Sequence, residues 1–496
     1  MAKTAVTPTR SENYADWYQN VIRAADLAEC APVRGCMIIK PWGYGIWERI
    51  QKILDAKIRE MGVSNAYFPL FIPLSFLERE AEHVEGFAKE CAIVTHHRLE
   101  AKDGKLIPKG PLEEPLVVRP TSEAIIGDAF SRWISSHRDL PLMVNQWANI
   151  VRWEMRTRVF LRTTEFLWQE GHTAHATKEE ALGKTMEALE LYRWLAETVL
   201  AMPVILGEKS PAERFPGAEN TFCMEAMMQD CKALQAGTTH YLGQNFSKVF
   251  GIRFCDQDGD LKFAYTSSWG VSTRLMGGLV MTHGDDNGMR VPPIISPEQI
   301  VILAIVPSEE HRKEVLAYAH ALAADLRLQS FAGESVRVLV DDRDRRGGEK
   351  NWEWIKKGVP IRVEVGPKDI EKRQAVIMRR DCDVRDKEVL SLEKLTRNIS
   401  ALLEDIQSNY FQQALAFRDR NMHGNIETLQ EMQDFFDSKG RGFILGKWCE
   451  DPKTEALLDQ TKISIRCLPL KSRDTEGACL LTGKIAKRDA IFAKAY

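Results

Sequence analysis

The sequence predicts an α+β domain built on an antiparallel sheet flanked by helices, followed by an α/β domain and a small α+β C-terminal domain. Strand-like and helix-like stretches of mixed length fill residues 1–290. Short apolar strands and amphipathic helices alternate over residues 297–405, which is typical of an α/β domain. A proline-rich stretch, residues 291–297, separates these two parts, and residues 406–496 form the third.

Composition narrows the class of protein. The chain has 496 residues, which is too many for one core, and its 44% hydrophobic and 28% charged residues are typical of a globular protein. A net charge of -3 gives no general attraction for nucleic acid, so any RNA contact needs a local basic patch. There is no signal-peptide pattern at the N-terminus, no membrane-length apolar run and no Cys-x-x-Cys pair among ten cysteines. We therefore expect a cytoplasmic protein with reduced thiols and no membrane partner.

The N-terminal domain opens with clear periodicity. Apolar residues at helical spacing predict a helix over 44–61, which Gly62 would end. The apolar stretch 65–73 predicts one extended strand, and the polar residues 83–110 predict loops around short strands. The other elements expected here are a strand over 116–119, a helix over 121–137 capped by Thr121 or Ser122, antiparallel strands over 142–154 and 160–168 joined by a basic loop over 155–159, and a helix over 178–201.

The rest of the chain follows a different pattern. Residues 221–285 alternate between strand-like and loop-like stretches. The α/β domain should contain a mostly parallel sheet. Its expected elements are strands over 300–306, 336–340, 361–365 and 375–379, helices over 309–328 and 349–358, and a long helix over 392–417.

Two arginines far apart in the sequence are candidates for a nucleotide site. Arg152 lies in a strand-like run, and Arg274 begins a helix-like one. Neither belongs to a glycine-rich phosphate loop, because Lys178 stands where such a loop before Gly183 would need glycine. Taken alone, each arginine is more often part of a surface or interface ion pair. Together they suggest a site that holds a nucleotide by charge and needs no catalytic base.

Three blocks of sequence carry a specific resemblance. They are Lys40-Pro-Trp-Gly-Tyr-Gly-Ile-Trp-Glu48 through Phe71-Ile-Pro73; Arg119-Pro-Thr-Ser-Glu123 with Asn145-Gln-Trp147, Arg152-Trp-Glu154 and Arg162-Thr-Thr-Glu-Phe-Leu-Trp-Gln-Glu-Gly-His172; and Gly243-Gln-Asn-Phe246 with Ser268-Trp-Gly270 and Arg274. These blocks are similar to motifs 1, 2 and 3 of the class II aminoacyl-tRNA synthetases. Over essentially its whole length the chain resembles the prolyl-tRNA synthetases of the archaeal-eukaryotic type.

The resemblance implies a two-step reaction. Proline and ATP give prolyl-adenylate and diphosphate, and the prolyl group then passes to the terminal ribose of tRNA(Pro). Because a carboxylate is already a nucleophile, positioning and charge neutralisation supply the catalysis. By similarity, Arg152 contacts the α-phosphate and the proline carboxylate, and Arg274 holds the γ-phosphate. The other implied ATP contacts are Glu154, which would accept from the adenine amino group, Thr163, Gln235 and Thr238.

The resemblance also implies a proline pocket. Glu123 would pair with the secondary ammonium, and Thr121 would accept its other hydrogen. The remaining residues implied for the pocket are Arg152; Phe166, Trp168 and His172 around the ring; and Ser268, Trp269 and Gly270 at the floor. Phe87 and Glu90 resemble a loop that closes over proline. The alternative is that the aromatic residues and the histidine belong to the core and that Glu123 serves only a helix N-terminus.

Several partners follow from the same resemblance. Magnesium should accompany ATP, with Glu225 and Asp230 as candidate ligands, although surface acids on a helix are usually only solvated. In the α/β domain Asp342, Arg343, Lys356 and Arg379 would read the anticodon. Motif 1 of this class forms a subunit interface, so the stretch Ala66–Ile72 predicts a homodimer.

Two departures from relatives, one shared feature and two rival interpretations remain. Relatives bind zinc through four cysteines, but only Cys449, Cys467 and Cys479 remain here, with Thr454 or a neighbour and Leu481 at the other two places, so we expect no zinc. Glu170 to Gln244 spans only about 75 residues, so the bacterial editing domain is expected to be absent. Tyr496 should tuck back toward the catalytic domain. The rivals are a threonine enzyme of the same class and a non-catalytic paralogue.

Overall fold

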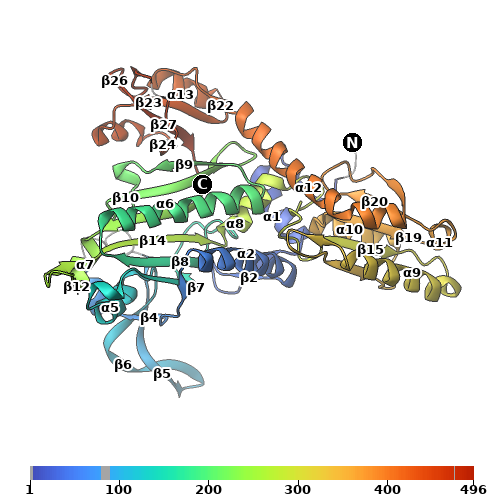
Figure 1. Cartoon of the computed structure of the whole chain (residues 1–496), viewed down its shortest axis with the longest axis horizontal. Coiled ribbons are helices and arrows are strands. Elements are labelled where there is room, and N and C mark those ends of the chain that lie inside the picture. Colours follow the sequence, from blue (N-terminus) through green and yellow to red (C-terminus); the bar gives the residue numbers. More distant parts are fainter. Residues whose placement is uncertain (1–3, 80–89, 439, 474) are drawn as a thin grey trace.

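The computed structural model describes residues 4–79, 90–438, 440–473 and 475–496. Three parts lie in the predicted order (Figure 1): a body around a large sheet, an α/β unit on one side of it and a C-terminal unit on another. Within the described residues, no helix is both long and apolar enough to cross a membrane.

One sheet of eleven strands runs through both the body and the C-terminal unit. Its strands are antiparallel except at its two edges, where β3 pairs with β7 and β22 with β23 in parallel. In spatial order the strands are β22 (Met422–His423), β23 (Phe443–Trp448), β27 (Arg488–Lys494), β24 (Ile463–Pro469), β9 (Val204–Glu208), β10 (Asn220–Met227), β11 (Ala233–Gly243), β14 (Tyr265–Ser272), β8 (Glu165–His175), β7 (Leu142–Val151) and β3 (Ser64–Asn65). The antiparallel catalytic sheet that the sequence predicts is therefore present, and it continues into the C-terminal unit through β9 and β24.

Helices cover this sheet. In α2 (Pro41–Glu60), Ile46, Ile50, Leu54 and Ile58 recur every fourth residue and are all buried, which explains why this segment is a helix. Gly62, at φ +79, lies just beyond its C-terminal end, as predicted. The other helices of the body are α1 (Tyr14–Ala24), α3 (Leu74–Arg79), α5 (Glu123–Trp133), α6 (Lys178–Trp194), which continues as a π-helix over Leu195–Val199, α7 (Asn245–Phe250) and α8 (Arg274–His283).

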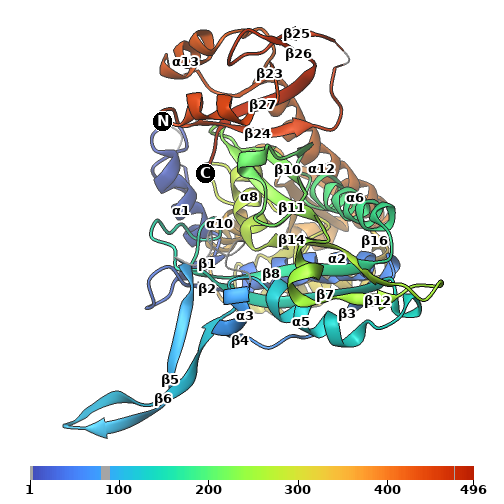
Figure 2. The same cartoon turned by 90° about the vertical axis from the view of Figure 1, so that its left-hand side faces the viewer.

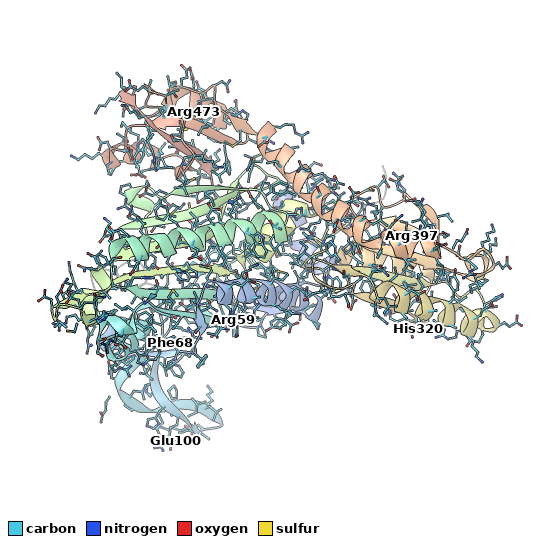
Figure 3. All side chains as sticks on the ribbon, in the orientation of Figure 1. Arg59, Phe68, Glu100, His320, Arg397 and Arg473 are labelled. Carbon is cyan, nitrogen blue, oxygen red and sulfur yellow. The ribbon has the colours of Figure 1, made fainter. Side chains whose placement is uncertain are left out.

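Two predicted segments of the body are wrong. The stretch 65–73 is not one strand, because only Asn65 at its start, in β3, and Phe71–Pro73 (β4) pair with other strands. In place of loops, β5 (Ala92–Lys102) and β6 (Lys105–Val118) form a long hairpin that projects from the body (Figure 2). Its turn is Asp103-Gly104, with both φ values positive, a recognised hairpin signal in the sequence. Glu100 marks the outer part of this arm in Figure 3.

A third prediction is partly wrong. The strand expected over 160–168 begins only at Glu165 (β8) and runs on to His175. The connection from β7 to β8 is therefore 152–164, longer than the predicted basic loop, and it carries Arg152.

The α/β unit has a five-stranded sheet in the order β18-β15-β19-β20-β21. Only β18, β15 and β19 are mutually parallel, whereas β20 and β21 are antiparallel, so the sheet is more mixed than predicted. Its elements are β15 (Ile300–Ala304), α9 (Glu309–Arg327), β18 (Val338–Asp341), α10 (Gly347–Lys357), β19 (Ile361–Val365), α11 (Pro367–Lys372), β20 (Gln374–Arg379) and β21 (Glu388–Ser391).

A single helix joins this unit to the C-terminal one. Helix α12 (Leu392–Arg420) crosses between them, so the boundary expected at 405 falls inside a continuous helix. The C-terminal unit adds α13 (Leu429–Asp437), a 3-10 segment (Pro452–Leu458) and the short pair β25 (Gly477–Ala478) and β26 (Ile485–Ala486). Short strand pairs elsewhere are β1 (Ala28–Cys30) with β2 (Met37–Ile39), β12 (Arg253–Cys255) with β13 (Leu261–Phe263), and β16 (Ser330–Phe331) with β17 (Glu334–Ser335).

Tyr496 lies against the body. Its backbone N–H donates to the carbonyl oxygen of Ala233 at 3.3 Å. The Tyr496 ring lies 5.6 Å from the guanidinium of Arg158 and 5.0 Å from the ammonium of Lys232. The side chain thus connects the 152–164 loop to the β10–β11 turn, as the tucked position predicts.

Candidate active site

A cavity of about 310 Å³ opens over the middle of the large sheet. Strands β8, β14 and β11 form its floor, and it is closed by α5, the start of α8 and the 213–216 loop. Its lining residues are Thr121, Glu123, Arg152, Phe166, Trp168, Glu170, His172, Glu213, Arg214, Phe215, Pro216, Thr221, Gln235, Ala236, Gly237, Thr238, His240, Ser268, Trp269, Gly270, Val271, Ser272 and Arg274. Every residue predicted for the proline pocket is in this set.

Strand register explains why distant residues meet here. Across β11, β14 and β8, Thr238 lies opposite Gly270, and Gly270 lies opposite Glu170. The next row is His240, Ser268 and His172. Because alternate residues of a strand share a face, these rows present their side chains to the same side of the sheet.

Glu123 supplies a carboxylate at one wall. It is the first residue of α5 and is buried. One of its oxygens accepts a short hydrogen bond from the Thr121 hydroxyl, and the other accepts from the Ser268 hydroxyl at 3.4 Å. Glu123 also interacts electrostatically with Arg152 and His172. A buried carboxylate that accepts from two hydroxyls suits a cationic ligand group.

Beside it, Glu170 holds His172. The Nε2 atom of His172 lies 2.9 Å from one carboxylate oxygen of Glu170, and the other oxygen accepts from Ser122 at 2.6 Å and from Gln146 at 2.8 Å. Burial acts to lower the pKa of His172, but the hydrogen bond and the charge of Glu170 outweigh it, so the pKa is raised above its usual value. Glu170 was not predicted as a site residue, although its alternation with Trp168 and His172 along one strand was visible.

The two arginines concentrate positive charge in the cavity. The Nε atom of Arg152 donates to the carbonyl oxygen of Pro120 at 2.8 Å, and its guanidinium lies 5.7 Å from the Phe166 ring. Arg274 donates to the carbonyl oxygens of Leu161 and Gln235 at 3.3 and 3.4 Å.

Arg274 has no direct carboxylate partner among the described residues. The charge of Glu225 attracts it, but that carboxylate is paired with Lys209 and Arg466. Burial lowers its pKa to about 10, and repulsion from Arg152 and Arg162 acts in the same direction. Such a guanidinium is suited to an anionic ligand.

Aromatic side chains shape the rest of the cavity. Phe166 and Trp168 meet edge to face at 6.1 Å, and Phe215 lies 4.5 Å from the His240 ring. A Cβ atom on Gly171 would lie 2.1 Å from the Trp269 ring, so only glycine leaves room for that ring. Phe215 was not predicted because its loop is remote from the motif blocks. His240 was not predicted either, although it alternates with the predicted Thr238 on β11.

Several predicted contacts lie elsewhere. Glu154 and Thr163 do not line the cavity, and the Glu154 carboxylate accepts from the backbone N–H of Arg156 at 2.8 Å. Glu90 is near the 152–164 loop, since its carbonyl oxygen accepts from the N–H of Trp153 at 2.8 Å. Phe87 lies outside the described residues.

The magnesium candidates do not fit a metal site. Glu225 lies on β10, not on a helix, and is fully buried between Lys209 Nζ at 2.8 Å and Arg466 Nη2 at 3.0 Å. Asp230 pairs with Lys232 at 3.0 Å in the β10–β11 turn. Neither lines the cavity, and the described residues contain no cluster of three or more potential metal ligands.

Two of the four residues predicted to read the anticodon form ion pairs within the described part of the chain. Arg343 pairs with the buried Asp341 at 2.6 Å, and Arg379 pairs with Asp381 at 2.7 Å. Asp342 is exposed at the end of β18, and Lys356 is half-buried on α10.

Of the three cysteines at the zinc positions of relatives, Cys479 lies beside Cys449, whose backbone N–H donates to the Cys479 sulfur, whereas Cys467 lies in a different cluster. Cys467 is buried on β24, where Gly207 of β9 packs directly against it. The Cys449 sulfur lies 3.8 Å from the Thr482 hydroxyl, so Thr482, not Leu481, faces it. Leu481 and Thr454 are buried, and Thr454 accepts from the Trp448 ring nitrogen at 2.9 Å.

Comparison with known protein families agrees with this geometry. The "tRNA synthetase class II core domain (G, H, P, S and T)" matches residues 108–283, the "Anticodon binding domain" matches 300–402, and "Prolyl-tRNA synthetase, C-terminal" matches 429–496. With the antiparallel sheet and the arginine-lined cavity, these matches define a class II aminoacyl-tRNA synthetase.

Individual relatives narrow the class. A proline–tRNA ligase of Protochlamydia amoebophila is 62% identical, over 100% of this chain and 99% of that one. Another, of Paramagnetospirillum magneticum, is 57% identical over 100% and 99%. The structure of Cryptosporidium parvum prolyl-tRNA synthetase complexed with halofuginone and AMPPNP superposes with a TM-score of 0.89, at 38% identity over 99% of both chains. The chain belongs to the prolyl-tRNA synthetase family, and this membership implies ATP-dependent ligation of proline to tRNA in two steps.

Proposed function

We propose that the cavity over β8, β14 and β11 is where this chain makes prolyl-adenylate and then passes the prolyl group to tRNA(Pro). The observation that carries the proposal is the pairing of one buried carboxylate, Glu123, with two arginines in a single 310 Å³ cavity. A zwitterionic amino acid presents a cation and an anion, and ATP adds further negative charge. The cavity has matching groups for each.

The charges suggest one orientation for the substrates. The ammonium of proline lies at Glu123, with Thr121 and Ser268 beside it, while Phe166, Trp168, Trp269 and His172 surround the ring. The proline carboxylate then points toward Arg152. Gln235, Thr238 and Arg274 line the part of the cavity left for ATP.

In the first step, a carboxylate oxygen of proline attacks the α-phosphorus in line, and the bond to the departing diphosphate breaks. Arg152 neutralises charge at the α-phosphate, and Arg274 holds the far end of the triphosphate. In the second step, a hydroxyl of the terminal ribose attacks the prolyl carbonyl carbon, and AMP leaves. Glu154 and Thr163 remain proposed ATP contacts, and Phe87 and Glu90 a proposed lid.

Magnesium is part of the proposed function, whereas zinc is not. Magnesium bound to ATP phosphate oxygens is part of the proposal, but Glu225 and Asp230 are not its ligands, for the reasons above. Zinc is not part of it, because Cys467 packs against β9 away from Cys449 and Cys479, and hydroxyl or apolar groups fill the neighbouring positions.

The remaining parts of the proposal concern type and assembly. An archaeal-eukaryotic-type enzyme without an editing domain is supported by the segment from Glu170 to Gln244, which consists of β8, α6, β9, β10, β11 and their connections. A homodimer is supported by Tyr67 and Phe71, exposed in the motif 1 stretch, while their neighbours Phe68 and Ile72 are buried. A cytoplasmic location is supported by ten cysteines that all remain free thiols.

Domain roles complete the proposal. Residues 1–290 carry the catalysis, 297–405 bind the anticodon and 406–496 form the C-terminal domain. In the anticodon domain Asp342, Arg343, Lys356 and Arg379 remain the proposed anticodon contacts, with both arginines already held by carboxylates.

Charging of tRNA(Pro) with labelled amino acids tests the function. Proline should be attached with release of AMP and diphosphate, and threonine should not. Alanine and cysteine should be activated at a measurable rate, because an apolar pocket discriminates by only about 1–3 kcal/mol per missing methylene. Preferential charging with threonine would show that the pocket assignment is wrong, and no charging with any amino acid would favour a non-catalytic paralogue.

A further inference from the structure

A second cavity, of about 1120 Å³, lies where the N-terminal segment, α12 and the C-terminal unit meet. It shares no lining residue with the active-site cavity. Figure 2 shows both chain termini on this side of the molecule, below the C-terminal unit. No step of the proposed reaction uses this space.

The cavity contains an excess of positive charge. Arg420 lies at the end of α12, Arg441 just before β23 and Lys494 at the end of β27, and all three line it. Among the described residues, none of these three cations forms an ion pair with a carboxylate. Lys494 instead lies 5.1 Å from the Phe436 ring. The three therefore remain available to an anion.

The other cations of the lining are already neutralised. Lys232 pairs with Asp230 at 3.0 Å, and Arg290 pairs with Asp285 at 3.0 Å. Arg10 lies 3.8 Å from Asp286. Glu12 also lines the cavity and accepts hydrogen bonds from Thr9. Its one negative charge lies against three cations, Arg420, Arg441 and Lys494, each from a separate element, so the excess is positive.

Buried hydroxyls in the lining also lack partners. Tyr410 is 1% exposed, and its hydroxyl has no hydrogen-bond partner among the described residues. The hydroxyl of Thr282 is likewise buried without one. Both oxygens are enclosed by protein, so they are unsatisfied polar groups beside the cavity and not contacts for its occupant.

We propose that this cavity is a binding site for a small phosphate-bearing anion. Guanidinium groups bind phosphate through paired N–H donors, and three cations from three elements match several phosphate oxygens better than one carboxylate. The hollow shape favours a small ligand, since small-molecule sites are concave. The site does not depend on the active-site assignment.

Calorimetric titration with inorganic tripolyphosphate tests the proposal. A prolyl sulfamoyl-adenosine, an analogue of prolyl-adenylate without phosphate, is added in excess to occupy the active site. The full-length protein should still bind tripolyphosphate, and the double variant Arg420→Gln/Arg441→Gln should bind at least tenfold more weakly. Both arginines are exposed, so the double variant should fold normally, which circular dichroism checks. Arg397→Gln is the matched control, because Arg397 is an exposed arginine at the other end of α12 (Figure 3) and should not change binding.

Lys494→Gln gives an independent check. Loss of this third cation, which lies on a different element from the two arginines, should weaken tripolyphosphate binding a few-fold. If tripolyphosphate binds equally well to the wild type and the double variant, or does not bind once the active site is filled by the phosphate-free analogue, the proposal is wrong. The tRNA affinity of the double variant is also measured against salt concentration. If this variant still binds tripolyphosphate, but the slope of log affinity against log salt concentration falls by about two, the cavity contacts RNA instead.

Discussion

Glu225→Gln separates a structural role for this carboxylate from a role in magnesium binding. Glu225 is fully buried on β10 and accepts from Lys209 Nζ at 2.8 Å and Arg466 Nη2 at 3.0 Å. Both cations are themselves almost completely buried. Removing one charge leaves two buried cations without a counter-charge, and breaking even one buried pair in this way costs about 3–5 kcal/mol.

The loss of stability should be greatest where the body joins the C-terminal unit. Lys209 follows β9 and Arg466 lies on β24, the strands that connect the body to the C-terminal unit. We expect the free energy of unfolding to fall by about 3–5 kcal/mol. Hydrogen exchange should become faster over 463–469 and 204–208. The control, Glu393→Gln, breaks an exposed pair on α12 and should change stability by about 0.3–0.5 kcal/mol. If stability is unchanged and the magnesium concentration needed for half-maximal activity rises tenfold, the structural assignment is refuted.

Two further predictions concern the pocket itself. Gly171→Ala places a Cβ atom 2.1 Å from the Trp269 ring, so we expect the KM for proline to rise about tenfold or more. The control, Gly183→Ala on α6, has open space around it and should leave this KM unchanged. Equal KM values for the two variants in steady-state kinetics would contradict this packing. Glu170 raises the pKa of His172, so protonated His172 stabilises the fold fully below about pH 6.5, and this contribution is lost as pH rises through the raised value. In Glu170→Gln the NMR titration of His172 should move to lower pH; an unmoved titration would exclude Glu170 as the cause.

Motif strings located the pocket because the chemistry is local to them. Trp168, Glu170 and His172 alternate on one strand, so a period of two places them on one face. Glu123 opens a helix, and this too is visible in the sequence. Of these, only Glu170 was missed, because a strand carboxylate between two named residues looks like a structural partner until its contact with His172 is seen.

Other features depend on contacts between distant residues. Lys209 donates to the backbone of Arg466, 257 residues away, and no local pattern predicts that β9 and β24 pair. The position of Glu225 between two cations follows from that pairing. Because the sequence does not reveal the pairing, it offers the Glu225 carboxylate only as a candidate metal ligand. The hairpin over 92–118 was missed for a different reason. Its exposed strands lack apolar alternation, and the Asp103-Gly104 turn was the only clear signal.

The central claim is that Arg152 and Arg274 activate proline without a catalytic base. Proline-dependent exchange between diphosphate and ATP, measured with magnesium in wild type, Arg152→Ala and Arg274→Ala, tests it most directly. Loss of one such preorganised group typically costs about 2.7–4 kcal/mol, so each variant should lose about a hundredfold to a thousandfold in exchange rate. The control, Arg385→Ala, removes an exposed arginine and should leave the exchange rate unchanged. Wild-type exchange in both active-site variants would contradict the account.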